Sequence, residues 1–179
     1  FVLPFVDCCN PGTEKIIEHY NATWQDLSQF LDTKEEIWMT KIKSPTNGYE
    51  CFRWQQNVRQ GNTYDFMEYK RKGPQTKSMR LRAKLYNSTE RPVMKIRHYT
   101  EGEDRGYDYT LQYWQPEEKC ALLRFPGENC GQFTWKSHIG NTSSCDEAYH
   151  TMCSYATLPV FKPSCLRKID ICIGLPSRC

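Results

Sequence analysis

Cysteine is the residue type in this chain with the most chemistry to offer. Ten of the 179 residues are cysteines, and their even number suits complete pairing. Neither a Cys-x-x-Cys pair nor a His-x-x-x-His pair occurs in the sequence, so the spacing does not suit zinc. We therefore predict disulfides formed in an oxidising compartment, and no metal or other cofactor. The ten are Cys8, Cys9, Cys51, Cys120, Cys130, Cys145, Cys153, Cys165, Cys172 and Cys179.

Three triplets match the acceptor for N-linked glycans, which requires a surface position and passage through the secretory pathway. Their asparagines are Asn21, Asn87 and Asn141. The opening residues 1–6 lack a basic region ahead of an apolar run, so we interpret them as a mature N-terminus. The cysteines and the acceptors together predict a secreted, extracellular protein.

Sequence motifs that indicate catalysis do not occur: there is no nucleophile elbow, phosphate-binding loop or metalloprotease motif. We therefore predict a binding protein and not an enzyme. The net charge of +3 is too small to indicate a nucleic-acid partner. No run approaches the roughly 20 apolar residues of a membrane span, so we predict no membrane partner. We expect a monomer.

The periodicity of the apolar residues predicts the elements that position these groups. Apolar residues at three- and four-residue steps predict a helix over 11–31, with Thr13 as its cap. Eight period-two segments with short turn signals between them follow. A second helix is expected over 144–156, with Ser144 as its cap. The strands are expected at 36–44, 49–59, 63–71, 77–85, 93–100, 107–114, 120–125 and 131–138.

Consecutive antiparallel strands of this number close most simply into an up-and-down barrel, which leaves no exposed edge. We predict a mainly β fold and a single domain over 1–179. A β-sandwich is the alternative. The lumen of an eight-stranded barrel is either filled by side chains or holds one small ligand. The expected parts are an N-terminal segment 1–35, the barrel 36–139, the helix 144–156 and a disulfide-stapled tail 166–179.

This order of elements and cysteines resembles the tick salivary lipocalins, the family that includes the histamine-binding proteins. The likeness covers about 20–165. It is carried by Trp24-Gln-Asp-Leu27 leading into Ile37-Trp38-Met39, by Cys120-Ala-Leu122 followed by Phe133-Thr-Trp135, and by a helix opening at Cys145 ahead of Cys165. The resemblance implies a lipocalin barrel with the disulfides Cys51–Cys165 and Cys120–Cys145. The pairing of the other cysteines stays open: Cys8, Cys9, Cys130, Cys153, Cys172 and Cys179.

Amine-binding members of that family carry a Cys-Asp motif and a Glu-Leu motif, whose carboxylates compensate the charge of a buried ammonium. The corresponding positions here are Ala121 and Phe133-Thr134, so the chain resembles a divergent member in which amine binding is disfavoured. Four residues could supply a substitute carboxylate, and we interpret them as solvated groups on outer faces: Glu50, Asp65, Glu68 and Asp108.

Basic and aromatic residues give two further candidate sites. Arg80, Arg82 and Lys84 alternate with apolar residues and should share one outer face. The candidate protein-binding patch, whose alternative is an ordinary soluble face, consists of Lys70, Arg71, Lys72, Lys77, Arg80, Arg82 and Lys84. The aromatic candidates, which could line the lumen or fill it, are Trp38, Trp54, Tyr109 and Trp135.

From the resemblance we expect a salivary protein that suppresses host defence by sequestering its target. The missing carboxylates, the basic strand and the extra disulfides favour a host immune protein, such as a complement component. The alternative is a small host mediator bound in the lumen. That mediator could be an eicosanoid, a fatty acid, a sterol or an amine such as histamine or serotonin.

Overall fold

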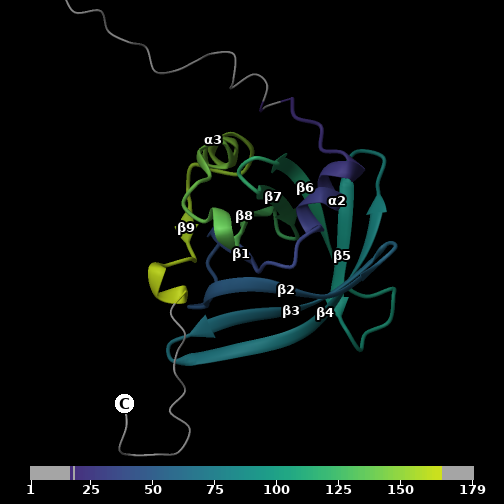
Figure 1. Cartoon of the computed structure of the whole chain (residues 1–179), viewed down its shortest axis with the longest axis horizontal. Coiled ribbons are helices and arrows are strands. Elements are labelled where there is room, and N and C mark those ends of the chain that lie inside the picture. The colour runs from purple at the N-terminus through teal and green to yellow at the C-terminus, as the bar shows by residue number, and fades with distance from the viewer. Residues whose placement is uncertain (1–16, 18, 167–179) are drawn as a thin grey trace, which may run out of the picture.

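A computed structural model describes residue 17 and residues 19–166 of the chain (Figure 1). The predicted tail beyond Leu166 lies outside these residues, as do Cys8, Cys9, Cys172 and Cys179. Each of the eight period-two segments forms a strand, so their prediction is confirmed. The strands are β1 (Ile37–Ile42), β2 (Glu50–Gln60), β3 (Thr63–Lys72), β4 (Gln75–Asn87), β5 (Pro92–His98), β6 (Tyr107–Gln115), β7 (Cys120–Phe125) and β8 (Asn129–Trp135).

The eight strands form a closed antiparallel barrel. Strands β2 to β8 pair in chain order, and β1 joins the two ends of the sheet by pairing with both β8 and β2. The predicted up-and-down barrel is therefore confirmed, and the sandwich alternative is wrong. A further two-residue strand, β9 (Leu158–Pro159), was not predicted and pairs with β1.

Inward-facing aromatic rings fill the middle of the barrel. The centroid of the Trp54 ring lies 5.1 Å from that of Phe66 and 4.7 Å from that of Phe133. Tyr64 lies 5.2 Å from Phe66 by the same measure. Full burial of one such side chain is worth about 1.5–3 kcal/mol, so this packing is a main source of stability. Aliphatic side chains complete the core, among them Leu85, Met94, Leu111 and Leu123.

The helix α2 (Trp24–Leu31) is shorter than the helix predicted over 11–31. Residues 20–23 are not helical, and residues 11–16 lie outside the described part of the chain. A capping box begins α2: the Thr23 hydroxyl accepts from the Asp26 N–H, while the Asp26 carboxylate accepts from the Thr23 N–H. The helix buries Leu27, Phe30 and Leu31 against the barrel core, and these contacts hold α2 in place.

The second helix, α3 (Ser143–Met152), packs on the outside of β6, β7 and β8. Tyr113 and Leu122 from the barrel meet Ala148 and Tyr149 from the helix in a separate apolar cluster. Neither α2 nor α3, nor any other helix among residues 19–166, has the length and apolar character needed to cross a membrane. Helix α3 covers one outer side of the barrel, as Figure 1 shows.

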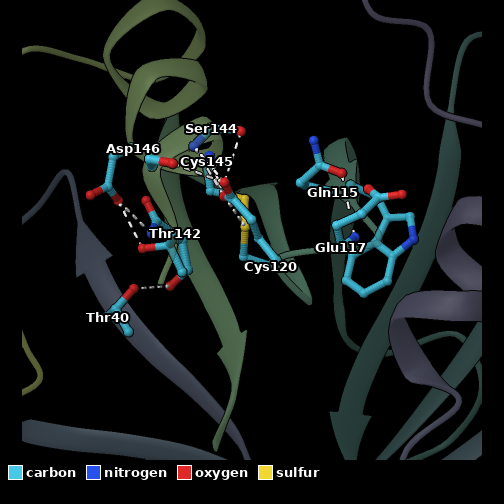
Figure 2. Close-up of a disulfide and its surroundings, with 12 residues drawn as sticks. Thr40, Gln115, Glu117, Cys120, Thr142, Ser144, Cys145 and Asp146 are labelled. Carbon is cyan, nitrogen blue, oxygen red and sulfur yellow. Dashed lines mark hydrogen bonds between the residues drawn. A yellow bond between two sulfur atoms is a disulfide. The ribbon is translucent and has the colours of Figure 1, made fainter. Parts of the chain in front are cut away.

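The start and the end of α3 both differ from the predicted 144–156. Ser144 lies inside the helix and does not cap it. The Glu118 carboxylate instead accepts hydrogen bonds from the backbone N–H groups of Ser144 and Cys145, so a side chain from outside the helix acts as the cap. The helix ends at Met152. Figure 2 shows this helix start beside the disulfide between Cys120 and Cys145.

Within the described part of the chain, three disulfides fasten the segments outside the barrel to its strands. Two of them are the pairs that the family resemblance implies, and the third joins the start of β8 to the end of α3, a pairing that the sequence left open. Several disulfides in one chain are typical of an extracellular protein. The pairs are Cys51–Cys165, Cys120–Cys145 and Cys130–Cys153.

A β-bulge in β1 reverses the faces of its second half. Ile37 and Met39 point into the core. The register with β8 then shifts between Met39 and Lys41, so that Ile42 enters the core. Lys41 turns outward, where its ammonium nitrogen lies 2.5 Å from the Asp146 carboxylate of α3. An uninterrupted period of two from 36 to 44 would predict Lys41 on the face of Ile37 and Met39, which is wrong because one extra residue shifts the alternation.

Candidate functional site

A cleft of about 330 Å³ opens at the end of the barrel next to the β5–β6 loop, which we call the mouth. Its wall combines apolar and aromatic side chains with a few polar groups, as ligand pockets do. The volume lies at the lower end of the roughly 300–1,000 Å³ typical of such pockets, so it suits a small ligand. The cleft is lined by Glu68, Met79, Leu81, Ile96, Arg97, His98, Glu101, Gly106, Tyr107 and Tyr109.

Strand pairing brings Glu68 into this cleft. Glu68 lies directly across from Trp54 on β2 and from Met79 on β4. Directly paired residues share one face of a sheet, and Trp54 belongs to the core, so Glu68 also points inward. Its carboxylate accepts a hydrogen bond from the Trp54 indole N–H, with 3.3 Å between nitrogen and oxygen. The Lys70 ammonium nitrogen lies 3.3 Å from the same carboxylate.

The environment of Glu68 makes its charge available to a ligand. Only 17% of its side chain is exposed. A charge in such a partly desolvated position interacts more strongly with an opposite charge than it would in water. The side chain of its partner Lys70 is 25% exposed, and a lysine carries its ammonium group on a flexible stem. A ligand cation could therefore take the place of the lysine ammonium.

Tyr109 forms the neighbouring wall of the cleft. Its ring centroid lies 6.1 Å from that of Trp54 and 4.9 Å from that of Phe125, against which it is stacked. Burial, helped by the negative charge of Glu68, raises the pKa of Tyr109 to about 12. The phenol therefore keeps its proton at neutral pH and can donate a hydrogen bond. The faces of these rings also attract cations.

Three of the four aromatic residues predicted for the lumen face the inside of the barrel. Trp54 donates a hydrogen bond to Glu68, which lines the cleft, and Tyr109 lines the cleft itself. Trp135 packs against the core close to α2, where its indole N–H donates to the Phe30 carbonyl at 3.0 Å. Trp54 and Tyr109 thus belong to the candidate site, and Trp135 does not contribute to its lining.

Trp38 does not face the lumen, although it is buried. It pairs with Thr134 on β8, which pairs in turn with Cys120 on the side of the barrel covered by α3. The alternation of the sheet therefore directs Trp38 outward. There it packs against Phe161 from the C-terminal segment, with 5.5 Å between the ring centroids. The prediction of a lumen position is wrong because an apolar segment outside the barrel buries this residue equally well.

The basic residues predicted as one patch lie on two faces of the β3–β4 hairpin. Lys70 and Lys77 are directly paired, and both share the inward alternation of Glu68, as does Lys72. The three ammonium nitrogens gather around the ring of Tyr49, at 5.3, 5.4 and 5.6 Å from its centroid. This arrangement lowers the pKa of Tyr49, chiefly through its hydrogen bond with Lys77.

The other four basic residues face outward, and acids already bind three of them. Arg82 holds the Asp65 carboxylate by two hydrogen bonds, of 2.6 and 2.7 Å. Arg71 lies 2.9 Å from Glu50, and Lys84 lies 3.5 Å from Glu103. The guanidinium groups of Arg80 and Arg82 both lie over the ring of Tyr99. The seven basic residues therefore do not form a single continuous surface.

The four candidate carboxylates also differ in their surroundings. Glu50 is bound by Arg71 and by Lys162, and Asp65 is bound by Arg82. Asp108 is exposed and lies opposite Lys95 on the outer face. The interpretation of all four as solvated outer groups is wrong for Asp65, which is buried, and for Glu68, which faces the cleft.

A signal for Glu68 was present in the sequence. It lies two residues after Phe66 on the same strand, so the period of two gives both the same face. Met79 and His98 carried no comparable signal, because the alternation along a strand predicts a face but not a neighbour on another strand. The acceptors Asn21, Asn87 and Asn141 are all exposed, as glycosylation requires, and their modification stays a prediction.

No protein-family model matches this chain, and no curated protein matches it in sequence. Among solved structures, Japanin from Rhipicephalus appendiculatus bound to cholesterol is similar over 74% of this chain and 96% of that chain, with 13% identity and a TM-score of 0.57. The AM182 serotonin complex is similar over 78% of this chain and 91% of that chain, with 13% identity and a TM-score of 0.59. In its fold, the chain is therefore a lipocalin-like eight-stranded barrel.

Proposed function

We propose that this chain is a secreted protein that binds a small amine with an aromatic or apolar body in the cleft at the barrel mouth. The position of Glu68 carries the proposal: it is an inward-facing, mostly buried carboxylate that accepts from the Trp54 indole N–H and lines the cleft together with Tyr109. A protonated amine placed against Glu68 would replace the Lys70 ammonium, which can turn to water. Neither charge of the new pair would then be left without a partner.

The charges around the cleft favour a cation over an anion. Glu68 and Glu101 both line it, so a fatty acid or an eicosanoid would bring a third negative charge beside two carboxylates. Of the two cations nearest to these carboxylates, Lys70 pairs with Glu68 and Arg97 donates to the Glu101 carbonyl. A sterol hydroxyl could donate to Glu68, but it would add no attraction between opposite charges.

Two grounds for expecting a host immune protein as the target lose weight with this geometry. Glu68 can take the part of the carboxylates that are missing at Ala121 and Phe133, both of which belong to the packed core. The basic residues lie on two faces and are partly engaged. The ligands named with the two similar structures, cholesterol and serotonin, are small. We therefore place sequestration of a small host mediator ahead of capture of a complement component.

Isothermal titration calorimetry of the disulfide-intact protein with serotonin and histamine tests the proposal. We expect micromolar or tighter binding of at least one amine. Glu68→Gln should weaken it by about tenfold or more, because a hydrogen bond to a charged group is worth about 1.5–3 kcal/mol and 1.4 kcal/mol is tenfold. Glu103→Gln is the matched control, since Glu103 is 75% exposed and lies outside the cleft.

Two outcomes would overturn the proposal. One is the absence of heat with every amine, and the other is equal affinity of the wild type and the Glu68→Gln variant. Cholesterol and arachidonate are titrated in parallel. Binding of either one, unaffected by Glu68→Gln and without amine binding, would assign the barrel to a neutral or an anionic lipid instead.

A further inference from the structure

Among the residues that the structure describes, the first half of β4 has a neighbouring strand on only one side. Residues 75–79 pair with β3, but the pairing of β4 with β5 begins only at Leu81, opposite His98. Figure 1 shows the β3–β4 hairpin extending away from β5. All five residues of this stretch are exposed. The barrel is closed, yet this hairpin carries a free strand edge beyond it.

The direction of the backbone groups on this edge follows from one hydrogen bond. The Arg80 carbonyl accepts from the Tyr99 N–H at 3.1 Å, so Arg80 directs its backbone toward the β5 side. Successive residues of an antiparallel strand direct their N–H and C=O groups to alternate sides. The register with β3 runs without a shift through this stretch. The backbone groups of Thr76 and Ser78 therefore point to the open edge, where a further strand could pair with them.

The side chains around this edge are basic. Within residues 19–166, no acid forms an ion pair with Lys72, Lys77 or Arg80. The two nearby carboxylates are already bound, Glu50 by Arg71 and Glu68 by Lys70. The free backbone groups of Thr76 and Ser78 thus lie close to unpaired basic side chains, with Lys72 and Lys77 on one face of the hairpin and Arg80 on the other.

We propose that the open edge of β4 at Thr76 and Ser78 binds an extended, acidic peptide segment by strand addition. Main-chain hydrogen bonds would give the affinity, and acidic side chains beside Lys72, Lys77 and Arg80 would give the specificity. Met79, which is 37% exposed, adds an apolar contact next to the edge. The proposal concerns a partner protein and does not depend on the ligand of the cleft.

Charge argues against two other occupants. A second copy of the chain would bring one basic edge against another, and like charges facing each other across paired strands are destabilising. Residues 167–179 of the chain contain Arg167, Lys168 and Arg178 with a single acid, Asp170, so they are also a poor electrostatic match. Lysines on an edge commonly protect it against unwanted strands. The same lysines admit an acidic strand, because rejection of the wrong partners is one source of specificity.

The test uses a blocked peptide of about eight residues, an ordinary strand length, in which Glu alternates with Thr and Val. A peptide with Lys in place of Glu is the charge control. The acidic peptide N-methylated at alternate residues is the backbone control. Affinity is measured by calorimetry, and amide hydrogen exchange locates the contact. We expect only the unmodified acidic peptide to bind, with slower exchange at Thr76 and Ser78.

Two matched variants separate backbone pairing from charge. Ser78→Pro removes the outward N–H without breaking the pairing with β3, a position in which edge strands tolerate proline. Ser78→Ala keeps that N–H. We expect Ser78→Pro to weaken binding of the acidic peptide by about tenfold or more, and Ser78→Ala to change it little. A loss of this size is expected because proline removes one backbone hydrogen bond to the peptide and its ring hinders the approach of the added strand.

The proposal is overturned if the acidic peptide does not bind at millimolar concentration, or if the Lys peptide binds equally well. It is also overturned if the N-methylated peptide binds as tightly as the unmodified one, since charge alone would then explain the contact. Slow exchange of Ser78 in the free protein would overturn it too, because the edge would already be covered. Amine binding in the cleft is unaffected by these outcomes, so the two proposals can fail separately.

Discussion

The cap of α3 gives a prediction whose size can be worked out from the structure. The Glu118 carboxylate accepts bonds from the N–H groups of Ser144 at 3.0 Å and of Cys145 at 3.3 Å, and from the hydroxyls of Ser143 and Ser144 at 3.0 and 2.8 Å. It therefore satisfies donors that the first turn of a helix leaves unpaired, and it places a negative charge at the positive end of the helix.

The change is Glu118→Gln, which keeps the shape and one acceptor oxygen but removes the charge. A helix cap is worth about 0.5–2 kcal/mol, and a negative charge at a helix N-terminus adds about 0.3–1 kcal/mol. We expect the free energy of unfolding at pH 7 to fall by about 1–2 kcal/mol. For a chain of this size, each kcal/mol corresponds to about 2–4 °C in the melting temperature.

The pH dependence supplies a second measurement of the same cap. Burial acts to raise the pKa of Glu118, but the bonds from Ser144 and its neighbours outweigh burial and hold this pKa below its usual value. A carboxyl with a depressed folded-state pKa stabilises the protein fully above its unfolded pKa of about 4.3. That contribution is lost as the pH falls through the folded pKa. The gap between wild type and Glu118→Gln should therefore close on acidification.

The assay is urea denaturation followed by tryptophan fluorescence with the disulfides intact, repeated from pH 7 down to about pH 3, below the unfolded carboxyl pKa. Glu117→Gln is the matched control, because Glu117 is the exposed neighbour of Glu118 and its substitution should stay within about 0.5 kcal/mol. The reasoning is refuted if Glu118→Gln is as stable as wild type at pH 7, or if the gap between them does not depend on pH.

Two further substitutions test the loop at the mouth and the outer ion pair. Gly106→Ala should lower the free energy of unfolding by about 2–3 kcal/mol, because Gly106 has φ +107° and a Cβ there would lie 2.5 Å from the Ile96 carbonyl oxygen. Gly61→Ala has open space and should cost only about 1 kcal/mol, so equal losses would contradict the clash. Asp65→Asn should cost about 1–3 kcal/mol in the same denaturation assay, since it weakens both bonds to Arg82. A loss below about 0.5 kcal/mol would show that this pair is no more than a surface contact.

The inward carboxylate of this barrel, Glu68, lies on a different strand from the carboxylates expected at Ala121 and Phe133. Ala121 and Phe133 occupy β7 and β8 and are packed in the core, whereas Glu68 lies on β3. An inward carboxylate can be provided by any strand, because the alternation of every strand offers positions that face the lumen. Loss of an acid at one position of the family pattern therefore does not by itself exclude a cationic ligand.

The period of two and the turn signals were enough to predict the strands of the barrel, because both are local properties of the chain. The bulge in β1 was not predictable, since the residue that shifts the alternation after Met39 belongs to an otherwise ordinary strand pattern. The outward position of Trp38 was missed for a related reason. Its burial depends on Phe161, which lies far along the chain, so the residues around Trp38 in the sequence do not indicate this contact.

The amino-acid sequence by itself determined the class of this protein: a disulfide-bonded chain of consecutive β-hairpins, with acceptors for glycans at its surface. These properties follow from residue types and spacings that act within a few neighbouring residues. Only the tertiary structure decided which side chains line the cleft and where a strand edge stays open. Glu68 becomes a mostly buried charge because the β2–β3 pairing sets it beside Trp54 and the curvature of the barrel brings Tyr109 of β6 to the same cleft. Thr76 and Ser78 keep a free edge because β5 ends before it reaches them. The local alternation gives the face of Glu68, but which strands meet and where their pairing stops depends on residues far apart in the chain.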